Sequence, residues 1–413
     1  MAKARKDNRG RTLHKGETYR KNDNTYMYKY TDPMGRKRYI YSQDLAKLRE
    51  REMKLVRDQL DGLDVYVAGS ATINYTFDRY ISMKRDLKNT TKGNYIYSYD
   101  HYVRDSFGKK KLADVKYSDV LKFYLSLMDE KKIKISTIES VQSCLRPTFE
   151  LAYKDDIIRR NPCTGVISEL KKSVGDETGI RHALSLEEQT AFTRYIEGND
   201  SFRNWYPLFT IMLGTGMRIG EVLGLRWEDI DLEKRIISVN HSLVNYKDTE
   251  ETNKCKYSIS TPKTKAGIRF IPIIDSVYKA FLEQKEMYDI VGGCTSEIDG
   301  MSGFIFFNRF LTILKASSVN KAIKSISENY NAEEIIRARR ENRDPVILPH
   351  FSCHHLRHTF CARLCEADVN IKVIQQIMGH KDIQTTLDIY AEVSETKKHE
   401  SMLQFVDMFK EIY

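Results

Sequence analysis

The sequence of 413 residues lacks the features that mark secreted, membrane-spanning and nucleotide-binding proteins. Its seven cysteines are scattered, and its longest apolar run, around 206–213, is much too short to span a bilayer. No apolar stretch follows the basic amino terminus, so no signal peptide is predicted, and we expect a cytoplasmic protein with reduced thiols. No glycine-rich phosphate loop follows a predicted strand, and no cofactor is expected.

What the chain does have is an excess of positive charge and enough apolar residues for several cores. Lys and Arg number 67 against 57 Asp and Glu, which gives a net charge of +10, and 41% of the residues are hydrophobic. A basic excess attracts polyanions, because each phosphate that is neutralised releases counterions. Nucleic acid is therefore the first partner to consider, for a chain long enough to form two or three domains.

Residues 1–70 predict a small three-stranded sheet backed by one helix. The strands are expected at 17–21, 25–31 and 36–42, and they are rich in tyrosine. Ser42 can cap the helix, whose apolar residues recur at helical spacing: Leu45, Leu48, Leu55 and Val56. A sheet of this size can enter a major groove, although a solvated basic sheet that binds nothing is the alternative. Its candidate DNA-binding residues are Arg20, Lys29, Arg36, Lys37 and Arg38.

Residues 71–170 predict a helical domain, which a flexible linker at 171–182 follows. The expected helices are 76–85, 91–106, 118–131 and 136–154. The last one shows the pattern of a capping box, with Ser136 at the cap and Glu139 three residues on. Two further candidates for DNA binding stand at the start of the second helix, Thr91 and Lys92.

Residues 183–413 predict a mixed α+β domain dominated by helix. Ser185 and Glu188 form a second capping-box pattern at its first helix. Strands are expected near 235–239, 256–260 and 269–273, with helices before and after them. Because helices and strands come in runs without βαβ alternation, a doubly wound sheet is not expected. The whole chain is therefore predicted to be multidomain and mainly α.

An arginine follows a flexible glycine turn at the start of one predicted helix of this domain. Arg218 stands directly after Gly216-Met217, where its guanidinium would lie beside the positive end of the helix dipole. Such a place favours an oxyanion. Glu221, one turn on, can hold the arginine side chain. A structural Arg–Glu pair at the surface is the alternative.

Other side chains with acid–base or nucleophilic chemistry follow in order. They are Lys263 or Lys265 in a turn between two strands, His354 and Arg357 on one helical face, then His380 and Tyr390. Phosphoryl transfer from DNA needs this combination, because its transition state gathers negative charge on the nonbridging oxygens. A lysine can protonate the leaving oxygen. A phenol, whose ordinary pKa is about 10, becomes a usable nucleophile beside such cations.

The ordered set Arg218, Lys263, His354, Arg357, His380 and Tyr390 resembles the active-site signature of the tyrosine recombinases. The surrounding segments TGMRIGEVLGLRW, HHLRHTF and MGHKDIQTTLDIY carry the same resemblance. The helical region 71–170 is similar to the core-binding domain of that family. Residues 1–70 are similar to the arm-binding domain of integrases from conjugative transposons of Gram-positive bacteria.

The resemblance implies a DNA strand transferase that needs neither metal nor ATP and uses Tyr390 as the nucleophile of a 3′-phosphotyrosyl intermediate. It implies that Lys263 rather than Lys265 is the catalytic lysine. Its implied partners are double-stranded DNA with core and arm sites, three further copies of the chain in a tetramer, and an excisionase or a bacterial DNA-bending protein. No membrane is expected as a partner. An apolar stripe at 402–412 predicts a tail helix that packs either in cis or on a neighbouring copy.

Three alternatives remain open at this point. Six candidate ligands crowd into one short segment and could form a zinc site, although zinc usually takes ligands from two separate elements: Cys353, His354, His355, His358, Cys361 and Cys365. A DNA-binding regulator without catalysis would have lost some of the six groups, all of which are present. A type IB topoisomerase uses similar chemistry but does not need the small amino-terminal sheet.

Overall fold

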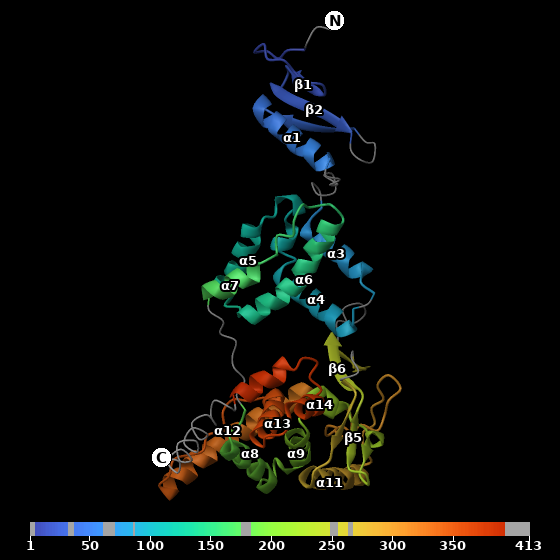
Figure 1. Cartoon of the computed structure of the whole chain (residues 1–413), viewed down its shortest axis with the longest axis vertical. Coiled ribbons are helices and arrows are strands. Elements are labelled where there is room, and N and C mark those ends of the chain that lie inside the picture. The colour runs from blue at the N-terminus through green and yellow to red at the C-terminus, as the bar shows by residue number, and fades with distance from the viewer. Residues whose placement is uncertain are drawn as a thin grey trace, which may run out of the picture. The chain divides into compact units, whose positions relative to one another are not determined.

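The computed structural model confirms a mainly helical chain with small antiparallel sheets (Figure 1). It describes residues 5–31, 37–60, 71–85, 87–174, 183–247, 255–262 and 267–392. Contacts divide the chain into two compact units, Met1–Thr178 with Lys247–Lys254, and Gly179–Tyr246 with Cys255–Tyr413. Within the described ranges, no helix is both long and apolar enough to cross a membrane.

The amino-terminal sheet is built from three antiparallel strands in the order β1-β2-β3. These are β1 (Glu17–Arg20), β2 (Thr25–Thr31) and β3 (Lys37–Ser42), and α1 (Leu45–Leu60) follows them. Tyr26 is buried with Leu45 and Leu48, and Tyr28 and Ile40 pack against this cluster. Because side chains alternate along a strand, α1 covers one face of the sheet and leaves the other exposed.

Two details of α1 differ from the sequence prediction. The cap is Asp44 rather than Ser42, because the Asp44 carboxylate accepts from the amides of Ala46 (2.7 Å) and Lys47 (3.0 Å). These bonds satisfy donors that the first turn leaves unpaired, and they lower the pKa of Asp44. Val56 is 40% exposed and does not belong to the core, although its spacing suggested that it would.

The described residues from 71 to 174 form five α-helices around one core. These are α3 (Ile73–Met83), α4 (Asn89–Tyr102), α5 (Tyr117–Lys131), α6 (Ile135–Lys154) and α7 (Val166–Val174). Thr72 caps α3 by accepting from the Tyr75 amide. In the core, the rings of Phe77 and Tyr99 stack with their centroids 3.6 Å apart.

The predicted start of α6 and the predicted linker are both corrected by the structure. Lys134 occupies the cap position of α6, so Ser136 lies inside the first turn and does not cap it. The helix α7 was not predicted and continues through the first four residues of the expected linker. Val166 and Leu170 bury its apolar face in the core of this unit. The rest of the expected linker, 175–182, lies outside the described residues.

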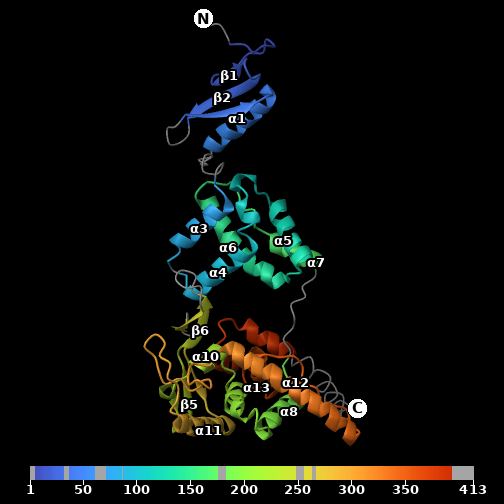
Figure 2. The same cartoon turned by 180° about the vertical axis from the view of Figure 1, so that it is seen from behind.

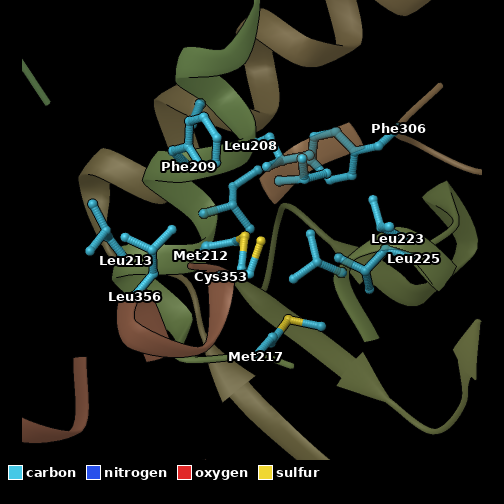
Figure 3. Packing of buried hydrophobic residues seen from close by; sticks show 14 of the residues in the cluster. Leu208, Phe209, Met212, Leu213, Met217, Leu223, Leu225, Phe306, Cys353 and Leu356 are labelled. Atoms are coloured by element: carbon cyan, nitrogen blue, oxygen red, sulfur yellow. The ribbon is translucent and has the colours of Figure 1, made fainter. Parts of the chain in front are cut away.

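The carboxy-terminal unit has at its centre the very apolar helix α9 (Tyr206–Thr215), nearly all of which is buried. Its other helices are α8 (Leu186–Gly198), α10 (Ile219–Gly224), α11 (Asp275–Val291), α12 (Ala316–Glu341), α13 (Cys353–Glu366), α14 (Ile371–Met378) and a last one at 384–392. The predicted capping box of α8 is present, since Ser185 and Glu188 bond each other reciprocally. Figure 3 shows Met212 of α9 beside Cys353 of α13 and Leu213 of α9 beside Leu356 of α13. Figure 2 shows α12, which contacts both α10 and α8.

Two small sheets complete this unit, and only part of them was predicted. The strands β4 (Ile230–Asp231), β5 (Ile236–Val239) and β8 (Arg269–Pro272) form one sheet, while β6 (Ser242–Lys247) pairs with β7 (Cys255–Ser260) in another. Neither β4 nor β6 was predicted. Since β7 and β8 belong to different sheets, the turn expected to carry Lys263 joins two sheets instead of closing one hairpin. The segment 263–266 itself lies outside the described residues.

Candidate active site

Three arginines converge on the carboxyl end of α14. Arg269 Nε donates to the carbonyl of residue 377 (2.7 Å), and Arg357 Nη2 donates to that of residue 378 (2.5 Å). Arg218 Nη2 donates to the carbonyl of residue 379 (3.0 Å). The last carbonyls of a helix have no partner within the helix, and they form the negative end of its dipole. This end of α14 therefore holds three cations that come from three distant parts of the chain.

Arg218 occupies the cap position of α10, where the sequence places it. Its backbone amide and its Nη1 donate to the two carboxylate oxygens of Glu221, at 2.8 and 2.9 Å, so the expected pairing is confirmed. The Arg218 side chain is 41% exposed, whereas that of Glu221 is 8% exposed. The arginine is thus anchored at one side and remains accessible to a ligand at the other.

Arg269 on β8 is the partner that sequence reasoning missed. Its Nη1 and Nη2 donate to the two oxygens of Glu221 at 3.1 and 2.8 Å, and it is 7% exposed. Burial alone raises the pKa of Glu221, but the hydrogen bonds and charge of Arg269, together with the charge of Arg218, lower it to about 2. The strand pattern contained a signal for this pair, because Arg269 shares the buried face of β8 with Ile271.

Arg357 is buried on α13, and its hydrogen-bond partners among the described residues are backbone carbonyls. Besides the α14 carbonyl, its Nη1 donates to the carbonyl of Gly216 at 2.6 Å. Burial and the nearby charge of Arg218 lower the pKa of Arg357 to about 9. Gly216 itself ends α9 at φ +61°, and a Cβ there would lie 2.3 Å from the Phe360 ring. Only glycine fits this turn, which places one carbonyl under Arg357.

His380 follows α14 directly and is 8% exposed. Its Nδ1 lies 2.9 Å from the hydroxyl oxygen of Thr386, which is completely buried. Burial and the charges of Arg357 and Arg218 lower the pKa of His380 to about 4. The imidazole is therefore neutral near pH 7, and the bond to Thr386 at Nδ1 leaves Nε2 as the nitrogen available to a ligand.

Tyr390 lies on the last described helix, which is attached to α13 on both sides of the tyrosine. Ile389 is buried with residues of α13 and α14. Glu392 binds His358 of α13 at 3.2 Å. Between them, Tyr390 is 39% exposed. His354, the remaining candidate on α13, is exposed in the first turn of that helix.

Two parts of the chain match known protein families. Residues 184–397 match the phage integrase family, and residues 1–59 match the DNA-binding domain of the Tn916 integrase. The chain belongs to the phage integrase family. It is therefore a tyrosine-type, site-specific DNA recombinase and a DNA strand transferase, as its motifs predict. The match at the amino terminus also favours this conclusion over a topoisomerase.

Individual relatives of this recombinase include a transposase and integrases. The transposase from transposon Tn916 of Enterococcus faecalis is 32% identical over 95% of this chain and 94% of its own. The ICEBs1 integrase of Bacillus subtilis is 24% identical over 77% of this chain and 78% of its own. Among solved structures, a Tn1549 transposon integrase in complex with transposon right end DNA has a TM-score of 0.68 at 29% identity, and the match covers 80% of this chain and 99% of that one.

The basic residues predicted to bind DNA do not all share one face of the recombinase's amino-terminal sheet. The strand register places Arg38 opposite Tyr30, on the face that α1 covers, so it does not lie with the others. Arg20, Lys29 and Lys37 lie on the exposed face, and Arg36 lies outside the described residues. Thr91 and Lys92 lie in the first turn of α4.

Two exposed tyrosines on the same sheet face were missed by sequence reasoning. Tyr39 and Tyr41 are 47% and 45% exposed and alternate with half-buried positions along β3. The guanidinium of Arg20 lies 5.7 Å from the centre of the Tyr41 ring. Counting alternate residues of β3 would have found them, because Ile40 faces α1 and the residues on either side of it must face the other way.

The zinc site considered for α13 of the recombinase is not supported by the geometry. In the part of the chain that the structure describes, one group of three side chains has metal-ligand atoms close together, namely His14, Glu17 and Glu52. Both oxygens of Glu17 already accept from Arg49. Cys361 and Cys365 are instead buried in an apolar cluster, as small core residues are.

Proposed function

We propose that this recombinase integrates and excises a mobile element by cutting DNA with Tyr390. The tyrosine oxygen would bond to the scissile phosphorus, the bond to the 5′ oxygen would break, and a 3′-phosphotyrosyl link and a free 5′-hydroxyl would result. The observation that carries this proposal is that Arg218 and Arg357 bind the carboxyl end of α14, which His380 follows directly. Tyr390 lies on the next helix, whose Ile389 packs against α13 and α14.

We assign each group a role from its chemistry, and for Lys263, which lies outside the described residues, from the resemblance to the family. Arg218 and Arg357 would bind the nonbridging oxygens, because planar guanidinium groups match phosphate and stabilise the added charge. His380 would donate from Nε2 as a neutral imidazole. His354 would orient the phosphate from the exposed start of α13. Lys263 would give its proton to the leaving 5′ oxygen.

The reaction should need neither a divalent metal nor ATP. Arginine and imidazole donors supply the charge stabilisation that metal ions provide in other phosphoryl-transfer enzymes, and the phosphotyrosine keeps the bond energy for rejoining. We expect the purified protein to recombine circularised DNA of its element in buffer with EDTA and no ATP. Sequencing the products identifies the junction, and a synthetic duplex of it (the junction duplex) should yield a covalent adduct. Activity that appears only with added Mg²⁺ contradicts the proposal.

We propose that residues 1–70 bind arm sites and that 71–170 and 183–413 bind the core site. The family match of residues 1–59 and the exposed face with Arg20, Lys29 and Lys37 support the first assignment. The Tn1549 integrase fragment in complex with transposon DNA, which matches 80% of this chain, supports the second. A chain that begins at Ala71 should cleave the junction duplex at the rate of the full chain and lose affinity for separate arm sites. Loss of both activities would show that the division is wrong.

On DNA we propose a tetramer of this chain, assisted by an excisionase or a bacterial DNA-bending protein. The tail helix predicted from the apolar stripe at 402–412 lies outside the described residues; its sequence pattern supports association between copies, because an apolar face has to be buried. Family membership supports the accessory partners. Light scattering on two paired junction duplexes should give the mass of four copies, and a mass of two would contradict the tetramer.

A further inference from the structure

We propose that Arg269 is a positioning residue for strand cleavage, which it supports by holding Glu221 and, through Glu221, the phosphate-binding Arg218. This inference rests on the proposed function. Arg269 would be a seventh residue beside the six that the motifs suggest, and it would act without contacting DNA.

The hydrogen bonds of Arg269 to described residues all lie within the protein. Its Nε donates to the carbonyl of Ile377, and its Nη1 and Nη2 donate to Glu221. Every nitrogen of the guanidinium is therefore used within the protein, and the side chain is 5% exposed. Arg269 links the carboxyl end of α14 to the carboxylate that receives both the amide and the Nη1 of Arg218.

The charges explain why a second arginine is needed on Glu221. Without Arg269, Glu221 and Arg218 would form a neutral pair, and Arg218 would bind a phosphate less strongly. A buried carboxylate that lost its bidentate partner would also draw the remaining arginine toward itself. With Arg269 present, two arginines share the carboxylate, and Arg357 adds its charge without bonding Glu221, so the site stays positive.

The test compares cleavage of two junction duplexes. One carries the ordinary scissile phosphodiester, and the other carries a methylphosphonate there, in which a methyl group replaces one nonbridging oxygen and removes the negative charge. A residue that acts by placing Arg218 against this charge matters on the first duplex and much less on the second. A residue that only stabilises the fold affects both duplexes equally.

We expect Arg269→Met to slow cleavage of the phosphodiester by about 10²-fold, the usual cost of a small misplacement at a reacting centre. Most of this loss should disappear on the methylphosphonate, as it should for Arg218→Met. Arg269→Lys should be intermediate, since lysine supplies the charge without the two-pronged geometry. If Arg269→Met does not fold, Glu221→Gln tests the same link, and the same preference for the uncharged duplex is expected.

The matched control is Arg343→Met, which removes another arginine from a buried carboxylate in the same unit. Arg343 binds Glu334, whose side chain is 2% exposed, and neither bonds a residue of the site. Its effect, measured beside the unfolding midpoint of each variant, should be the same on both duplexes. Equal losses on the two duplexes for the Arg269 variants, or no loss at all, would overturn the inference. A wild-type protein that cleaves neither duplex would instead overturn the proposed function.

Discussion

Tyr390→Phe is expected to bind the junction duplex as the wild type does and to form no covalent adduct. The substitution removes one hydroxyl oxygen, which is the nucleophile, and keeps the ring. The helix that carries it stays attached, because Ile389 and the pair formed by Glu392 and His358 are untouched. Loss of a nucleophile typically costs about 10⁴-fold or more, so residual cleavage should be close to background.

Denaturing gels of labelled DNA measure the adduct, and mobility shifts in native gels measure binding. Tyr153→Phe is a suitable control, because Tyr153 on α6 is 46% exposed and is also a tyrosine at the surface. It should form the adduct at the wild-type rate. An adduct that persists in Tyr390→Phe would show that another of the 25 tyrosines attacks the phosphate.

Arg357→Met is expected to lose about 10²- to 10³-fold in cleavage, in line with the removal of one fixed oxyanion donor. In the described structure its hydrogen-bond partners are two backbone carbonyls, at Gly216 and Met378, so no carboxylate bonded to it cancels its charge. The charge is therefore available to the phosphate. Lysine should not restore activity, because an ammonium group cannot reproduce the planar fork that spans two carbonyls.

The same variant separates catalysis from stability. Burial lowers the pKa of Arg357 to about 9, which means that the fold disfavours the charged form. Removing this charge removes that penalty, which acts against the cost of the two hydrogen bonds that are lost. Cleavage should therefore collapse while the thermal unfolding midpoint stays near that of the wild type. A midpoint that falls in parallel with activity would show that Arg357 acts mainly as a structural residue.

Much of this architecture was predictable from local sequence pattern. The strands of the amino-terminal sheet, the capping box of α8 and the helical placement of Arg357 depend on neighbours a few residues apart, which periodicity detects. The strand β6 and the register that turns Arg38 toward α1 depend on pairing between strands, which no single segment contains.

The candidate site shows the same division. The motifs predicted Arg218 with Glu221, three residues apart, and the structure shows that pair. The pairing of Glu221 with Arg269 spans 48 positions and passes through two sheets, so it became visible only in three dimensions. The carbonyls at the end of α14 carry no sequence signature at all, because every residue has one.

That last property has a consequence for how the recombinase can change in evolution. The three arginines bind the backbone of residues 377–379, so the identity of those side chains does not enter the clamp, apart from Gly379, whose φ of +63° suits glycine. Substitutions along α14 can therefore accumulate as long as the core packing of Ile374 and Met378 is kept. Insertions cannot, because one extra residue turns the helix end by about 100° and presents each arginine with the wrong carbonyl. Natural variation in this helix should accordingly be rich in substitutions and poor in changes of length.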